Sequence, residues 1–144
     1  MNDKLADLAE RRISEHAEPT TANWCQRWVR LTVEAIYGKR YEALLHQPSA
    51  RLAALAFVAA QRSGDLPPGV EVIVGGTVKD TQLGDLLYKL GSHDAAPGHV
   101  GIRVRGNRVA ENSSTSLGRV YRALGFRTLS QYGKIDVIVR LPAA

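Results

Sequence analysis

The feature that most constrains the fold is an alternating stretch that runs from Gly98 to Ser114. Its apolar side chains occupy every second position, at Val100, Ile102 and Val104. This is the period of a strand with one buried face. Gly106-Asn107 follows, and both residue types accept the positive φ angles of a tight reversal. Residues 108–113 are therefore predicted to return antiparallel to the first strand, so the chain must build a sheet around this hairpin.

The open ends of this hairpin carry polar side chains that suit catalysis. His99 begins the first strand, and Glu111 and Asn112 lie near the end of the second. An imidazole beside a carboxylate or carboxamide is how a catalytic base is held and oriented. A three-residue loop at 105–107 places Glu111 on the face of His99, whereas a two-residue turn at 106–107 places Asn112 there. The first register also keeps Ala110 on the apolar face, so we favour Glu111.

The composition describes one globular domain with an excess of positive charge. The chain has 144 residues, of which 44% are hydrophobic and 23% charged, and its single cysteine cannot form an intrachain disulfide. A net charge of +5 favours anionic partners such as nucleic acid, cell-wall polymer or acidic lipid. No aromatic stacking pattern accompanies the arginines at 103, 105 and 108, which argues against nucleic acid. No stretch has the apolar length of a signal peptide or a membrane span, so we expect cytoplasmic synthesis and no membrane insertion.

Helices are predicted in the first half of the chain. Residues 3–16 form an amphipathic helix with few apolar residues, expected to pack loosely or to contact a partner. A second helix runs from Trp24 to Gly38, with three candidate N-caps before it: Thr20, Thr21 and Asn23. It is expected to bury two apolar lines, one beginning at Trp24 and one at Cys25. A third helix, 50–62, is expected to bury an Ala-rich face comprising Leu52, Ala53, Leu55, Ala56, Ala59 and Ala60.

Strands dominate from residue 70 onward. They are predicted at 70–74, 85–90, the central hairpin, 126–129 and 134–141, with a short helix at 116–124. Helices first and meandering strands afterwards indicate an α+β domain with an antiparallel sheet.

Cys25 lies in the first turn of the second predicted helix. Free N–H groups and the helix dipole stabilise a thiolate at this position. A lone cysteine among apolar residues is also a common packing residue, so the residues themselves leave both roles open. A metal site of His93, Asp94 and His99, completed by Cys25 or Glu111, has no standard zinc spacing to support it.

Three motifs together resemble the papain-like NlpC and CHAP cysteine peptidases. They are Cys25-Gln26-Arg27-Trp28-Val29, Leu83-Gly84-Asp85-Leu86-Leu87 and Gly98-His99-Val100-Gly101-Ile102. Their order matches the family's helix cysteine, Gly-Asp strand and histidine strand. The chain departs from the family at Gln26, where a small residue is usual, and at Glu111, where NlpC-type enzymes commonly carry a second histidine.

The resemblance implies a papain-like core with N-terminal helices packed on the sheet. Residues 19–144 would form the catalytic domain and residues 1–18 a helical extension. It further implies cleavage of a peptide or amide bond of peptidoglycan without a metal or cofactor. Cys25 would be the nucleophile and His99 the base, with Glu111 or Asn112 orienting the ring.

The sequence shows neither an export signal nor a separate wall-binding domain, and with the family resemblance this suggests where such a protein acts. We expect a phage lysin or an injected effector that reaches the cell wall after release by other machinery. The alternatives are a thiol hydrolase acting on protein amides, and a non-catalytic phage structural or binding module with a buried, inert Cys25.

Overall fold

The computed structural model describes residues 1–16, 21, 24–113 and 118–144. Within these residues the chain is α+β, with seven strands in one antiparallel sheet of order β1-β7-β2-β3-β4-β6-β5. The strands are β1 (Glu71–Val74), β2 (Leu86–Lys89), β3 (His99–Val104), β4 (Arg108–Asn112), β5 (Gly118–Tyr121), β6 (Leu124–Thr128) and β7 (Val137–Arg140). The helices are α1 (Asp3–Ser14), α2 (Cys25–Tyr37), α3 (Glu42–Leu45), α4 (Ala50–Ser63) and α5 (Leu129–Tyr132), with a short 3-10 turn at Val78–Asp80. The expected fold class is confirmed at this level.

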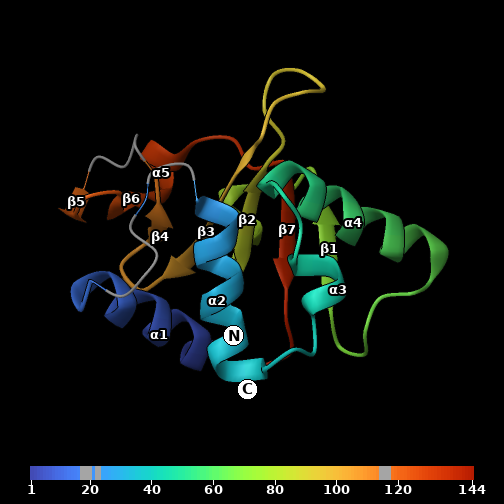
Figure 1. The fold of residues 1–144 in the computed structure, drawn as a ribbon, viewed down its shortest axis with the longest axis horizontal. Helices are drawn as coiled ribbons and strands as arrows, with labels where there is room; N and C mark the ends of the chain where they lie inside the picture. Colours follow the sequence, from blue (N-terminus) through green and yellow to red (C-terminus); the bar gives the residue numbers. More distant parts are fainter. Residues whose placement is uncertain (17–20, 22–23, 114–117) are drawn as a thin grey trace.

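Helices α1, α2 and α4 lie across one face of the sheet (Figure 1). Side chains alternate along each strand, so neighbouring residues belong to cores on opposite faces. Leu86, Tyr88 and Ala110 join the large core beneath these helices. A smaller cluster covers the other face and consists of Leu87, Val109, Leu129, Tyr132, Ile135 and Ile138.

The central hairpin has the register with a three-residue loop. Ile102 pairs with Ala110 and Val104 with Arg108, which leaves residues 105–107 as the loop. Gly106 and Asn107 both have positive φ, at 75° and 53°. Gly101 therefore stands opposite Glu111, and Glu111 shares a face with His99, as the register that we favoured requires.

Helix α1 packs more closely than predicted. Four of its side chains are buried in the large core: Leu5, Ala6, Ala9 and Ile13. The two alanines have small side chains that let the helix approach the sheet closely. The helix therefore buries a larger apolar face than its few large apolar residues indicate. The division of the chain at residue 18 stays a prediction, because residues 17–20 lie outside the described part.

The buried faces of α2 and α4 differ from the predicted ones. In α2 Trp28 and most of the line beginning at Cys25 are buried as expected, whereas Trp24 is 41% exposed. In α4 Leu52 and Leu55 are exposed. The residues facing the sheet are Ala50, Ala53, Ala54, Phe57 and Val58. The sheet selects this stripe because small residues allow close approach while Phe57 packs beside the Tyr88 ring.

The predicted helix at 116–124 is wrong for its described part. Residues 116–117 lie outside the described chain, Gly118–Tyr121 is strand β5 and Leu124 opens strand β6. Here the backbone pairing of β6 with β4, in which Glu111 lies opposite Gly125, outweighs the local preference for a helix. Residues 126–128 of the predicted strand at 126–129 belong to β6, and Leu129 begins α5.

Candidate functional site

The first residue of α2 is Cys25, and its side chain is only 8% exposed. The N-cap is Trp24, which makes no side-chain capping bond to the first turn. Thr21 is therefore not the cap, and the other two predicted caps, Thr20 and Asn23, lie outside the described residues. A helix start without a side-chain cap directs its backbone N–H groups toward whatever lies beyond it.

His99 begins β3 beside a glycine that no other residue could replace easily. Gly98 has a φ of +69°, and a Cβ there would collide with the carbonyl oxygen of Lys89 and the backbone of Arg51. Because Lys89 pairs with His99 across the ladder, this close approach fixes where β3 starts. The ring of His99 therefore projects from a rigid strand end.

Glu111 holds the ring of His99. His99 Nε2 lies 2.6 Å from Glu111 Oε1, and the carboxylate is completely buried. Glu111 has a glycine opposite it on each neighbouring strand, Gly101 on β3 and Gly125 on β6. The missing side chains leave space in which the carboxylate can meet its partners.

The Cys25 thiol interacts with the same ring from the helix side. Since Nε2 is engaged by Glu111, Nδ1 is the nitrogen available to Cys25. Burial by itself lowers the pKa of His99, but the hydrogen bonds to Cys25 and Glu111 outweigh it and leave that pKa raised above 6.5. The structure thus brings together Cys25, His99 and Glu111, an arrangement that can activate a thiol.

Asn112 lies on the opposite face of β4 from Glu111. Its neighbour in the chain, Glu111, points to the face of His99, and strand alternation turns Asn112 toward the large core. The side chain is completely buried. Of the two candidates at the hairpin end, Glu111 is the one that bonds His99.

Arg127 on β6 is the member of this cluster that the sequence did not reveal. Its Nε and Nη2 donate to the two oxygens of Glu111 at 2.6 and 2.7 Å, and its side chain is 11% exposed. Burial alone raises the pKa of Glu111, but the bonds from His99 and Arg127 outweigh it and lower that pKa below 4.5. The one signal in the sequence was a basic residue inside a predicted strand.

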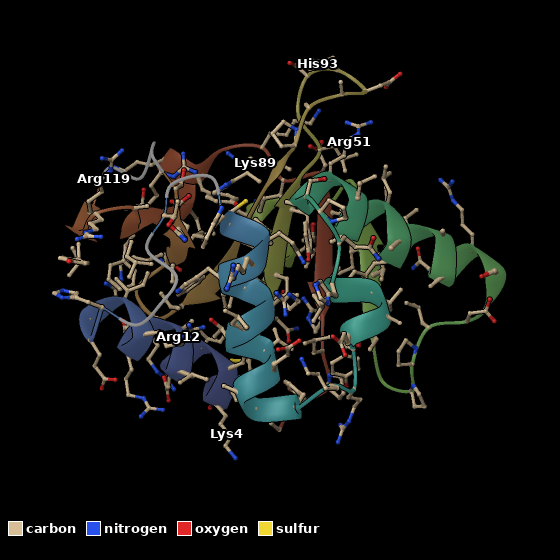
Figure 2. The ribbon with its side chains drawn as sticks, in the orientation of Figure 1. Lys4, Arg12, Arg51, Lys89, His93 and Arg119 are labelled. Carbon is tan, nitrogen blue, oxygen red and sulfur yellow. The ribbon has the colours of Figure 1, made fainter. Side chains whose placement is uncertain are left out.

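The ring of Tyr132 packs against the side chains of His99 and Arg127. Its ring centroid lies 5.8 Å from that of His99, 4.9 Å from the Arg127 guanidinium carbon and 4.2 Å from Lys89 Nζ. Figure 2 shows Lys89 at the end of the sheet where α2 begins. Cations over an aromatic face are attracted to it, so Tyr132 keeps these side chains in place.

A groove of about 530 Å³ flanks the beginning of α2. It is lined by Trp24, Gln26, Arg27, Arg30, His46, Gln47 and Pro48. The Arg27 guanidinium lies 4.6 Å from the centre of the exposed Trp24 ring. Cys25 does not line the groove, but both its sequence neighbours do.

The remaining motif residues are structural or distant. Asp85, in the Gly-Asp motif, is buried and accepts hydrogen bonds from Arg140 at 3.0 and 2.9 Å. His93 lies on the loop that projects beyond the sheet (Figure 2). Among the residues that the structure describes, no group of three or more His, Cys, Asp or Glu side chains is arranged to hold a metal ion. Within the same residues, no helix has the length and apolar character needed to cross a membrane.

Comparison with known proteins reveals a likeness in fold. No protein-family model matches the chain, and no curated protein matches it. The crystal structure of a wild-type endolysin, LysIME-EF1, has a similar fold, with a TM-score of 0.56 and 15% sequence identity. The match covers 99% of this chain and 66% of the endolysin chain, so this chain spans less than two thirds of that protein's length. At this identity the likeness concerns the fold, and the chain has an endolysin-like fold.

Proposed function

We propose that this protein is a papain-like cysteine peptidase or amidase of the NlpC/CHAP type that cleaves a peptide or amide bond of bacterial peptidoglycan. The observation that carries the proposal is the position of His99, bonded to Glu111 at 2.6 Å and interacting with the Cys25 thiol at the start of α2. The endolysin-like fold supports the cell wall as the target. The proposed setting is a phage lysin or an injected effector.

The proposed mechanism follows from the roles of the three side chains. His99 takes the proton of Cys25, and the thiolate attacks the carbonyl carbon of the scissile bond. The backbone N–H of Cys25 stabilises the oxyanion, because it belongs to the open first turn of α2. His99 then protonates the leaving amine, and afterwards it deprotonates the water that hydrolyses the thioester. Glu111 orients the ring and stabilises its charged form.

The positive charge of the chain suits an anionic wall. The net charge of +5 would concentrate the protein on wall polymers. The groove beside α2 carries Arg27 and Arg30 and is the place where we expect the substrate to extend past the reacting bond.

Incubation with purified peptidoglycan tests this proposal directly. We expect soluble fragments whose masses and new amino groups identify a cut peptide or amide bond. The fragments should form equally in the presence of a chelator, because no proposed step uses a metal. If peptidoglycan stayed intact after prolonged incubation with folded protein whose Cys25 thiol reacts with an alkylating agent, the proposed substrate would be wrong. An inert Cys25 would instead favour a binding module.

The orienting residue can be tested with two single substitutions. Glu111→Gln should lower turnover about tenfold, because it removes the charge that stabilises the imidazolium and leaves Arg127 facing the ring. The pKa of His99 should fall, and the histidine limb of the pH–rate profile should move to lower pH. Asn112→Ala should leave this profile in place, because Asn112 lies on the other face of β4. A silent Glu111→Gln together with a damaging Asn112→Ala would reverse the assignment.

A further inference from the structure

An arginine–carboxylate pair lies directly behind the base of the proposed site. Glu111 Oε1 is shared by His99 Nε2 at 2.6 Å and Arg127 Nη2 at 2.7 Å, while Oε2 accepts from Arg127 Nε at 2.6 Å. This is a two-pronged bond, which fixes the plane of the carboxylate as well as its position. Glu111 has no exposed surface on which water could replace either partner.

The charges of the three groups determine what His99 can do. With His99 protonated, Glu111 faces two cations. After His99 loses its proton, Arg127 still balances the buried carboxylate. Without Arg127, deprotonation of His99 would leave the buried Glu111 carboxylate without a cationic partner, which is strongly unfavourable. The ring would then hold its proton more tightly and would be a poorer acceptor for the proton of Cys25.

We infer that Arg127 is a positioning residue of this site: its guanidinium aims Glu111 at His99 and balances the carboxylate charge, so that His99 can both take up and release a proton. The inference rests on the proposed function for its catalytic consequence. Its effect on His99 is a property of the folded chain and can be measured without any substrate.

Other charged and titratable groups surround the ring without replacing Arg127. They are Cys25 on α2, Lys89 on β2 and Tyr132 on α5, with Asp136 acting on Lys89 and Tyr88 acting on Cys25 from the other face of β2. Lys89 is a further cation coupled to Glu111, but its Nζ donates to the carbonyl of Tyr132 and lies over the Tyr132 ring. It therefore supplies charge nearby but does not bond Glu111.

The chain offers a matched control pair in the same sheet. Arg140 on β7 donates to both oxygens of the buried Asp85 at 3.0 and 2.9 Å. Asp85 lies just before the first residue of β2, whereas His99 pairs with Lys89 at the last. Arg140→Met breaks a bond of the same kind away from the site. It therefore reports what loss of a structural ion pair does by itself.

The test is the pH titration of the His99 ring by NMR, with its signals assigned from their loss in His99→Ala. In Arg127→Met the midpoint should rise by about one pH unit, because the carboxylate then has only His99 as a cationic partner. Arg127→Lys keeps the positive charge but cannot form the two-pronged bond to Glu111. The titration midpoint of His99 should therefore stay near that of the wild type, while turnover falls about tenfold. Arg140→Met should leave the midpoint unchanged.

An unchanged midpoint in folded Arg127→Met would overturn the inference and reduce Arg127 to a structural role. If that variant does not fold, Arg127→Gln carries the same test, because it also removes the charge but can still donate one hydrogen bond to Glu111. A raised midpoint in a protein that leaves peptidoglycan intact would support the inference and contradict only the proposed substrate. The role of Arg127 and the proposed substrate can therefore be disproved independently of each other.

Discussion

Replacing Cys25 with alanine is expected to abolish the release of peptidoglycan fragments while leaving the fold intact. The thiol is the only one in the chain, and no other described side chain at the start of α2 contacts His99 as a nucleophile could. The rate should fall by about 10⁴-fold or more, as when the nucleophile of a comparable triad is removed. The loss of one small buried side chain should change the free energy of unfolding by only about 1 kcal/mol.

The measurement is fragment release over time, with circular dichroism and thermal unfolding of the same samples. Cys25→Ser is the matched variant, because it preserves shape and a hydroxyl but supplies a far weaker nucleophile. It should be nearly as inactive as the alanine variant. Folded Cys25→Ala protein with wild-type turnover would exclude the thiol mechanism altogether.

Replacing His99 with alanine should be as damaging as removing Cys25, because base and nucleophile act as one unit. The variant should also react more slowly with iodoacetamide. An unassisted thiol is only a few per cent thiolate at pH 7, whereas a protonated imidazole beside it stabilises the thiolate. Alkylation near neutral pH should therefore slow by about tenfold.

The single cysteine makes this measurement unambiguous, since every alkylated molecule is modified at Cys25. His93→Ala is the control: His93 lies on the projecting loop, so its loss should leave both alkylation and turnover unchanged. In denaturant all variants should react alike. Alkylation of native His99→Ala at the wild-type rate would mean that the two side chains do not work together.

The raised pKa of His99 also fixes the direction of its pH effect on stability. A protonated ring held by Glu111 and Cys25 stabilises the fold most fully below the ordinary histidine value of 6.5. This contribution is lost as the pH rises through the raised folded value. For Glu111 the sense is opposite, because its lowered pKa gives stability above 4.5 that is lost under acid.

Local patterns in the sequence were enough to predict several features of the fold and the site. Alternation at Val100, Ile102 and Val104 fixed the strand, and the requirement to keep Ala110 on its apolar face favoured the register that pairs His99 with Glu111. The position of Cys25 in the first turn of a helix was predicted as well, although the helix begins one residue later than expected. These are short-range properties, since the period of an element restricts which side chains share a face.

Which groups meet across the sheet depends on how the strands and helices pack in three dimensions. Arg127 reaches Glu111 because β6 lies beside β4, and nothing in the spacing of the two strands along the chain requires that pairing. The same pairing explains why the segment predicted as a helix forms strands. Packing against the sheet likewise buries Phe57 of α4 and leaves Leu55 exposed. Contacts between distant segments depend on how whole elements pack, and this packing outweighs the small free-energy preferences of single residues. The sequence therefore supplied the candidate cysteine, histidine and carboxylate, and the fold added the arginine that balances their charge.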